Sequence, residues 1–296
     1  MIKSFFDKLN ITYKENASLK NYNTYRINAS CSYLVFPKNI KELQEIIKEI
    51  KKQKIKYFIL GNGSNIILSM EHYSGVIIKL NELNKIEYHD NLVKIEAGCP
   101  LIKASLNTIE HGLSGLEFAS AIPGEVGASV AMNAGAYNSD MSEVVKEVTV
   151  LTDKCEIKTL KNEELDFTYR DSFLKKNKEY IVLSATFKLK KGNIAEMKAQ
   201  VEERRKKRIL SQPLEFPNAG SVFRNPENAF AGELIEKSNL KGYNVNGAEV
   251  SNKHANFIVN KGDAKGKDII ILIKKIQKEV KEKYNIDLKL EQIIIE

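Results

Sequence analysis

The sequence lacks an apolar run long enough to cross a membrane, and its first residues lack the pattern expected of a secretory leader. A membrane helix needs about 20 consecutive apolar residues, and no run in this chain approaches that length. The start, MIKSFFDKLNITYKEN, has no apolar signal core and no cleavage-like site. We therefore expect a soluble, cytoplasmic protein with no membrane partner.

Cysteine and histidine are both scarce. Cys31, Cys99 and Cys155 lie far apart, with no CxxC or metal-binding spacing, so we expect reduced, structural thiols. The four histidines are scattered in the same way. We therefore expect no metal site.

Basic runs with interleaved aromatic residues are also missing. The net charge is +8, from 46 Lys and Arg against 38 Asp and Glu. The lysines alternate with glutamates at helical spacing, as in KKIQKEVKEK (274–283), which is typical of solvated helix faces. We expect no nucleic-acid partner, although a mildly basic chain suits an anionic substrate.

A length of 296 residues with 43% hydrophobic residues suits a globular protein of two domains. Gly192 marks a break before a charge-rich helix, so we place the boundary there, with domains at 1–192 and 193–296. Both parts mix helix and strand patterns, which favours the α+β class.

A short β-α-β unit is predicted near the start of the chain. Its strands are 32–36 and 56–60, and Asn39 caps the helix between them, with Glu42 three residues on. The apolar face of this helix is Leu43, Ile46, Ile47 and Ile50. Further strands are predicted at 76–80, 86–88, 93–97, 144–151, 156–160, 180–189, 256–259 and 290–295, and further helices at 101–111, 193–209 and 232–238. A last long helix is predicted, with one apolar face formed by Ile269, Leu272, Ile273, Ile276 and Val280.

The loop GNGSN (61–65) lies between two apolar runs. It has no Lys-Ser/Thr after the glycines and no G-x-G-x-x-G before a helix, so it is neither a Walker loop nor a Rossmann fingerprint. Its consecutive, uncovered backbone N–H groups suit a pyrophosphate, and Ser64 and Asn65 add side-chain donors. A tight turn between strands is the alternative.

A second glycine-rich loop, Ile122–Gly127, is expected to offer another uncovered backbone. It leads into Asn133-Ala134-Gly135-Ala136-Tyr137. Two such loops in one domain suggest a ligand with a long, phosphate-bearing body.

Three polar residues stand out in other motifs. Arg170 in FTYRDSF could hold a carboxylate with its planar fork, or form a surface ion pair with Asp166 or Asp171. Ser221 in NAGSVFRNP lacks a G-x-S-x-G setting, so it is a proton donor or a turn-stabilising serine rather than a nucleophile. Glu291 in LEQIIIE is a buried acid or an exposed alternate strand position.

The order of these motifs resembles the UDP-N-acetylenolpyruvoylglucosamine reductase family, flavoenzymes of peptidoglycan precursor synthesis. The resemblance runs from about Asn16 to the C-terminus and indicates the shorter branch, which lacks a tyrosine-bearing substrate loop. It rests on NTYRI (23–27), ILGNGSN (59–65), GLSGLEFASAIPGEVGASVAMNAGAY (112–137), YRDS (169–172), AGSVFRNP (219–226), NLKGYNVNGAEVSNKHANFIVNKG (239–262) and Glu291.

The resemblance implies an FAD-binding domain of the vanillyl-alcohol-oxidase-like type at 1–192, with α+β lobes at about 1–70 and 71–192. A substrate-binding α+β domain follows at 193–296, and we expect a monomer. NADPH would reduce the FAD. Flavin N5 would then give hydride to C3 of the enolpyruvyl ether of UDP-N-acetylglucosamine, and C2 would take a proton, which yields UDP-N-acetylmuramate.

The resemblance also implies roles for single residues. Arg170 would hold the substrate carboxylate, Ser221 would protonate C2, and Glu291 would lie beside them with a raised pKa. Substrate contacts are expected from Tyr169, Arg224 and Lys241, the last two at the diphosphate. FAD contacts are expected from Asn23, Thr24, Gly61, Asn62, Gly63, Ser64, Asn65, Ile122, Pro123, Gly124, Gly127, Ala128, Asn133 and Gly135.

The chain departs from the family pattern at several places. Ala128 and Asn28-Ala29-Ser30 stand where glycines are usual, and Asn138 replaces a glycine but tolerates positive φ. The final Glu-Val-Arg is Glu291-Gln292-Ile293 here. Two rivals remain open: another FAD enzyme of this fold with tethered flavin, such as an alcohol or sugar-lactone oxidase, and a non-enzymatic nucleotide-sugar or nucleic-acid binding protein.

Overall fold

The structure is a computed structural model, and it describes residues 2–296. The chain divides into two compact units. The first contains the chain up to Glu15, Tyr33–Asn62 and Gly75–Arg205, and the second contains Asn16–Ser32, Gly63–Ser74 and Lys206–Glu296. Both units mix helices and strands, as the sequence predicts.

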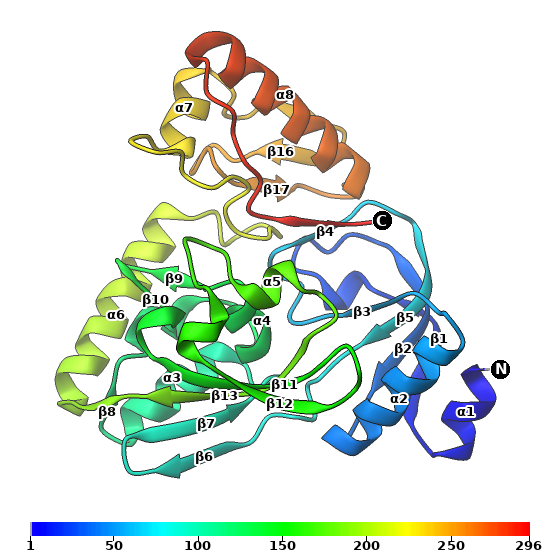
Figure 1. The fold of residues 1–296 in the computed structure, drawn as a ribbon. Coiled ribbons are helices and arrows are strands. Elements are labelled where there is room, and N and C mark those ends of the chain that lie inside the picture. The colour runs from blue at the N-terminus through cyan, green and yellow to red at the C-terminus, as the bar shows by residue number, and fades with distance from the viewer. Residues whose placement is uncertain (1) are drawn as a thin grey trace. The chain divides into compact units, whose positions relative to one another are not determined.

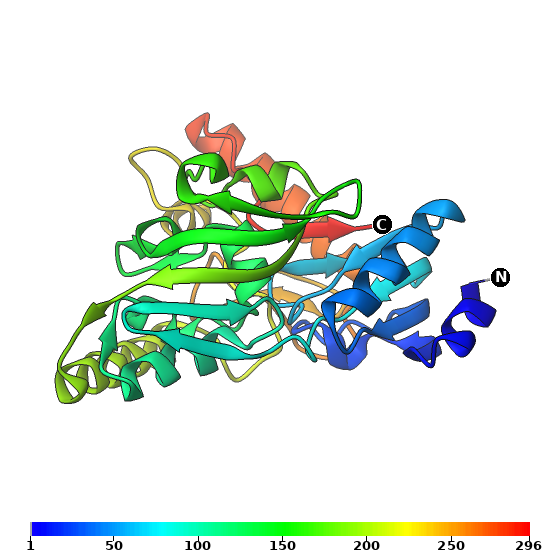
Figure 2. The same ribbon diagram turned by 60° about the horizontal axis from the view of Figure 1, so that its bottom comes forward.

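The first unit contains a five-stranded antiparallel sheet, whose strands lie side by side in Figure 2. In spatial order they are β12 (Ile157–Lys161), β11 (Val145–Leu151), β13 (Ile181–Lys188), β7 (Leu92–Glu96) and β6 (Ile86–His89). Helix α4 (Val126–Ala131) packs against β7 and β13, and α3 (Leu101–Glu110) packs against α4. All five strands confirm predicted segments to within about two residues.

A four-stranded sheet has the order β1 (Thr12–Ser18), β2 (Ser30–Phe36), β5 (His72–Ile78) and β3 (Tyr57–Ile59), with β3 parallel to β5. The predicted helix is α2 (Ile40–Lys52), and the Asn39 side chain accepts a hydrogen bond from the Glu42 N–H at 2.9 Å. Its predicted apolar face is fully buried. Helix α1 (Ile2–Lys8) packs against α2, as Figure 1 shows.

The glycine-rich segment after α3 forms a series of short elements. They are β8 (Leu113–Ser114), η2 (Glu117–Ala121), α4, β9 (Gly135–Ala136), β10 (Ser139–Asp140) and η3 (Met141–Glu143). The rest of the unit is η4 (Asn162–Leu165), α5 (Phe173–Lys176), β14 (Lys190–Lys191) and most of α6 (Ile194–Ser211). Helix α4 was not predicted. It approaches the end of β7 so closely that a Cβ on Gly127 would lie 2.7 Å from the Ala97 Cβ.

The second unit is built around α8 (Gly266–Tyr284), whose predicted apolar face is buried. This helix packs against an antiparallel sheet of β15 (Asn244–Val245), β16 (Ala248–Val250) and β17 (Ile258–Asn260), and against α7 (Ala231–Lys237) (Figure 1). A parallel pair, β4 (Ile66–Leu68) and β18 (Ile293–Ile295), and the turn η1 (Lys20–Tyr22) complete it.

The final strand is shorter than the predicted 290–295, because the chain changes its partner within that stretch. Leu290 pairs only with Phe223 in a single bridge, and Glu291 N–H donates to the Val222 carbonyl at 2.9 Å. From Ile293 onward the chain pairs with β4 instead. The apolar pattern could not show this change of partner.

Two further findings concern the whole described chain. Within residues 2–296, no helix combines the length and apolar character that a membrane span would need. The three cysteines are buried and free.

Candidate functional site

The GNGSN loop offers a row of bare backbone donors. Within residues 2–296, the N–H groups of residues 61–65 donate to no acceptor of the chain. Consecutive unpaired amides of this kind form an anion-binding concavity. The chain passes from the first unit to the second between Asn62 and Gly63, so each half of the loop has its own support.

In the second unit, the NTYRI turn supports Gly63. The Gly63 carbonyl accepts from the Thr24 N–H at 3.1 Å and from its hydroxyl at 3.3 Å. Gly63 has φ +66°, and a Cβ there would lie 2.2 Å from the Tyr22 carbonyl oxygen, so only glycine fits. The Asn23 amide is used inside its own turn, where it makes three hydrogen bonds to the backbone.

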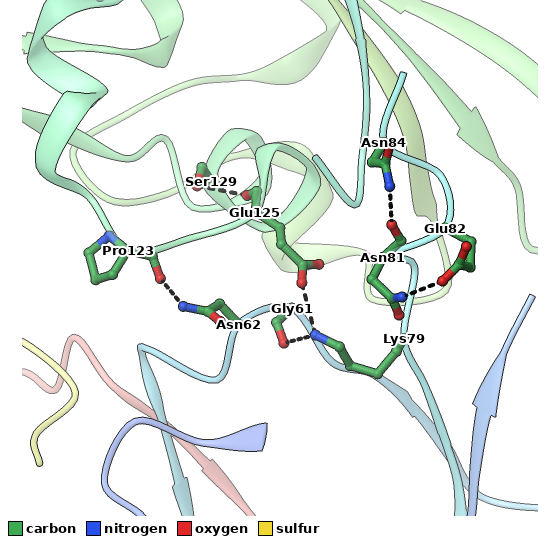
Figure 3. Close-up of polar contacts among 9 residues, drawn as sticks. All are labelled: Gly61, Asn62, Lys79, Asn81, Glu82, Asn84, Pro123, Glu125 and Ser129. Atoms are coloured by element: carbon green, nitrogen blue, oxygen red, sulfur yellow. Dashed lines mark hydrogen bonds and ion pairs between the residues drawn. The ribbon is translucent and has the colours of Figure 1, made fainter. Parts of the chain in front are cut away.

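In the first unit, a buried ion pair supports Gly61 (Figure 3). Lys79 Nζ donates to the Gly61 carbonyl at 2.6 Å and to Glu125 Oε1 at 2.8 Å. The Asn62 side-chain amide donates to the Pro123 carbonyl at 2.8 Å. The two glycine loops are therefore joined by this direct hydrogen bond and by Lys79, which contacts both Gly61 and Glu125. Neither Lys79 nor Glu125 was predicted as a site residue, because an isolated lysine and glutamate 46 positions apart carry no sequence signal.

The expectation of a second uncovered backbone at Ile122–Gly127 is wrong for most of its amides. Gly124 N–H donates to the Ile122 carbonyl at 2.9 Å. The N–H groups of Val126 and Gly127 donate at 2.9 and 2.8 Å to the carbonyls of Cys99 and Ala97, in the segment that follows β7. These bonds arise because α4 packs tightly against the sheet, which the glycine density alone did not reveal. Contacts of FAD with this loop, Ala128 included, stay predictions.

Arg170 is held in place by the segment that follows α4. Its Nη2 donates to the Gly135 carbonyl at 2.6 Å. The Asn133 side chain donates to the Thr168 carbonyl and accepts from the Ser142 N–H, both at 3.0 Å, which joins the two segments. Arg170 has φ +56°, an uncommon conformation for a residue with a side chain. The structure thus connects three predicted site residues within the first unit.

The neighbours of Arg170 bear on the alternative of a surface ion pair. Asp166, one of the two acids in that alternative, pairs with Lys176 at 2.7 Å. The Arg170 guanidinium lies 5.0 Å from the centre of the Tyr169 ring, which is 51% exposed. This arrangement presents an aromatic face and a cation together on the surface of the unit.

In the second unit, Ser221 lines a pocket of about 390 Å³. This volume lies within the range typical of small-molecule sites. The lining residues are Ser221, Asn225, Phe230, Gly232, Glu233, Glu236, His254, Ala255 and Asn256. Burial lowers the pKa of His254, which favours the neutral imidazole near pH 7.

Two buried amide side chains fix the backbone around Ser221. Asn256 accepts from the Phe223 N–H at 3.0 Å and donates to the Phe223 carbonyl at 2.8 Å. Gln292 donates to the carbonyls of the two residues before Ser221, at 3.0 and 3.2 Å, and accepts from the Tyr25 hydroxyl at 3.1 Å. Sequence analysis treated Gln292 only as a departure from the family pattern, and missed this role.

Glu291 and Ser221 belong to neighbouring stretches of the second unit. The Glu291 N–H bonds to the residue after Ser221, and the Glu291 carbonyl accepts from the Asn65 amide at 3.2 Å. Glu291 is half-buried, which lies between the two predicted alternatives. Arg170, the third predicted catalytic residue, belongs to the first unit.

The predicted diphosphate residues also lie in the second unit. Lys241 pairs with Glu236 of the pocket lining at 2.6 Å. The Arg224 N–H donates to the Lys289 carbonyl at 2.9 Å, which pairs the Ser221 loop with the C-terminal segment. Lys241 therefore sits next to a residue of the pocket that Ser221 lines.

Comparisons with known proteins point to one family. Residues 31–161 match the family of FAD binding domains, and residues 212–295 match the C-terminal domain of UDP-N-acetylenolpyruvoylglucosamine reductase. The reductase of that name from Clostridium novyi is 42% identical over 99% of this chain and 95% of its own length, and that from Lactobacillus acidophilus is 44% identical over 97% and 96%. The crystal structure of the Thermus caldophilus reductase has 31% identity and a TM-score of 0.81, and the match covers 97% of this chain and 99% of that one.

The fold and the matched domains define the class as a two-domain, FAD-binding α+β oxidoreductase, as the resemblance implied. Within that class, the chain belongs to the UDP-N-acetylenolpyruvoylglucosamine reductase family. The cofactor of the class is FAD.

Proposed function

We propose that the chain reduces the enolpyruvyl ether of UDP-N-acetylglucosamine to UDP-N-acetylmuramate, with NADPH as the reductant, in peptidoglycan precursor synthesis. The row of bare amides at residues 61–65, in a chain that relatives match over nearly its full length, is the observation that carries this proposal. When bound, FAD would supply hydride-transfer chemistry between NADPH and the enolpyruvyl group, and the amides of residues 61–65 would hold its pyrophosphate.

The residues of the GNGSN loop fit FAD by the chemistry of their donors. A pyrophosphate carries anionic oxygens that accept several N–H groups at once, and such bonds are about twice as strong as neutral ones. The carbonyls of Gly61 and Gly63 are both engaged on the protein side, which leaves the amides of the loop as donors. Thr24 would support the loop through the Gly63 carbonyl, to which its N–H and its hydroxyl donate, and its contact with FAD stays a prediction.

Substrate roles are proposed for residues within each unit. The pocket beside Ser221 and Lys241 suits part of an anionic nucleotide sugar. Arg170 would hold the enolpyruvyl carboxylate through its planar fork, with Tyr169 beside it. Arg224 would meet the diphosphate.

Proton transfer falls to Ser221 in this proposal. Hydride addition at C3 places negative charge at C2, spread into the carboxylate, and Arg170 would stabilise that charge. Ser221 would donate its hydroxyl proton to C2, with Glu291 close by on the paired segment. The amides of Asn256 and Gln292 would hold the Ser221 backbone still during this transfer.

Anaerobic half-reaction kinetics with Ser221→Ala test the assignment. Flavin reduction by NADPH should keep its rate, and oxidation by the enolpyruvyl nucleotide should slow by about 10²–10⁴-fold, the usual contribution of a general acid. Ser211→Ala, an exposed helix serine, is the control. Equal slowing of both half-reactions in Ser221→Ala would exclude Ser221 as the proton donor.

The state of the flavin separates this proposal from its rivals. Denaturation should release the yellow chromophore, whereas an oxidase of the same fold with tethered flavin would retain it. A purified chain that shows no flavin absorbance, even after FAD is added, would favour a binding protein without redox chemistry. The cytoplasmic location and the monomeric state stay predictions.

A further inference from the structure

Lys79 and Glu125 form a buried ion pair beneath the first glycine loop (Figure 3). Lys79 follows β5 and is 6% exposed, and Glu125 precedes α4 and is 8% exposed. The Lys79 ammonium contacts both the Glu125 carboxylate and the Gly61 carbonyl. One charged group thus touches both glycine loops of the first unit.

Stability alone is a weak reason for such a pair. Removing two charges from water is costly, and replacing a buried pair with apolar residues is often neutral or stabilising. Burial raises the pKa of Glu125, and the attraction of Lys79 offsets only part of that effect. A carboxylate beside a loop that binds phosphates would also repel the ligand unless a cation neutralised it.

The bond to Gly61 supplies a different reason. A trans peptide is planar, so its C=O and the next N–H point in opposite directions. When Lys79 holds the Gly61 oxygen on the buried side, the Asn62 N–H is turned the other way, toward the side where it has no acceptor within residues 2–296. Glu125 fixes the ammonium, and the bond from Asn62 to the Pro123 carbonyl adds a second link between the loops.

We propose that Lys79 is a positioning residue for FAD binding. By holding the Gly61 carbonyl, Lys79 directs the backbone N–H of Asn62 toward the pyrophosphate, and Glu125 anchors the Lys79 ammonium in this position. The inference rests on the proposed role of residues 61–65. It assigns the loop before α4 to the support of the first loop, which agrees with the internal use of its own amides.

Titration of the apo-protein with FAD, followed by flavin fluorescence, tests the proposal. Lys79→Met should raise the FAD dissociation constant by about tenfold to hundredfold, the loss expected for one hydrogen bond to a charged group. Glu125→Gln keeps an oxygen acceptor for the ammonium, so the constant should change by less than about threefold. Lys94→Met, which removes an exposed lysine of β7, controls for net charge and should have no effect.

A double variant separates positioning from stability. Lys79→Met leaves a buried acid without its partner, so the apo-protein should lose stability, and Lys79→Met with Glu125→Leu should restore much of that loss. FAD binding should stay weak in the double variant, because the Gly61 anchor is still missing. Recovery of FAD affinity together with stability would overturn the proposal, and so would unchanged affinity in a folded Lys79→Met protein. Failure of the unaltered chain to bind FAD would instead overturn the proposed function.

Discussion

Two loops, the GNGSN loop at residues 61–65 (here the first loop) and the Ser221 loop at residues 218–221 (here the second loop), have carbonyls held on the protein side, but by different chemistry. In the first loop an ammonium and a threonine hold the carbonyls of Gly61 and Gly63. In the second loop the neutral amide of Gln292 holds the carbonyls of Ala219 and Gly220. The first loop presents bare amides, and the second presents the hydroxyl of Ser221.

This difference follows from what each loop has to offer a ligand. Backbone donors need close approach and therefore glycine, and the first loop leaves no space for a side chain at Gly63. A side-chain donor such as the Ser221 hydroxyl needs a fixed backbone but no close approach of the backbone to the ligand. The second loop can therefore have open space around Gly220, and the Gln292 side chain holds its backbone. The glycines themselves show the contrast: a Cβ on Gly63 meets backbone, and a Cβ on Gly220 meets nothing within 4 Å.

The largest expected effect comes from an added methyl group at these two glycines. Both have positive φ, +66° at Gly63 and +74° at Gly220, so alanine at either costs about 1–2 kcal/mol from conformation. At Gly63 the Cβ would also lie 2.2 Å from the Tyr22 carbonyl, so Gly63→Ala should lose about 3–5 kcal/mol or fail to fold. Urea unfolding of both variants measures the difference. Equal midpoints would show that the two loops are not confined differently.

The next effect concerns the amide that holds the second loop. Gln292→Leu removes the hydrogen bonds to Ala219 and Gly220, and it should cost about 1–3 kcal/mol in stability. A serine displaced by about 1 Å should slow the second half-reaction by on the order of 10²-fold. Flavin reduction should keep its rate. Gln277→Leu removes a similar bond, to the Leu288 carbonyl, and should change stability without changing either half-reaction. A Gln292→Leu enzyme with normal kinetics would show that the Ser221 backbone needs no such support.

The sequence indicated which segments form the candidate site, but it did not indicate which side chains fix the backbone of those segments. Local signals sufficed for the capped helix at Asn39 and for the apolar face of α8, because both depend on neighbours in the chain. The residues that hold the loops, such as Lys79 and Gln292, act on backbone far away in the sequence. No local pattern marks such a contact, so their roles appear only in three dimensions.

The pH response of the second unit should follow His254. Burial, the largest cause, lowers its pKa, and nearby Lys241 lowers it further, while a backbone hydrogen bond and Glu236 oppose this shift. The unfolded chain then binds a proton below about pH 6.5 before the folded chain does, so folding stability should fall as the pH drops below that value. Denaturant midpoints between pH 7.5 and 5.5 should fall more steeply for the unaltered chain than for His254→Asn. Parallel slopes would mean that His254 titrates normally.

The smallest effect is expected at Ala128, beside the first loop. The resemblance implied glycine at this position, and the Ala128 Cβ lies 3.2 Å from the place that a Cβ on Gly61 would take. The methyl group therefore faces the protein's own loop. Ala128→Gly puts glycine inside α4 and should cost about 0.5–1 kcal/mol. The FAD dissociation constant, measured by fluorescence titration, should stay within about twofold. A marked gain in affinity would mean that the methyl group crowds the cofactor, and that the first loop is tuned by its packing as well as by its amides.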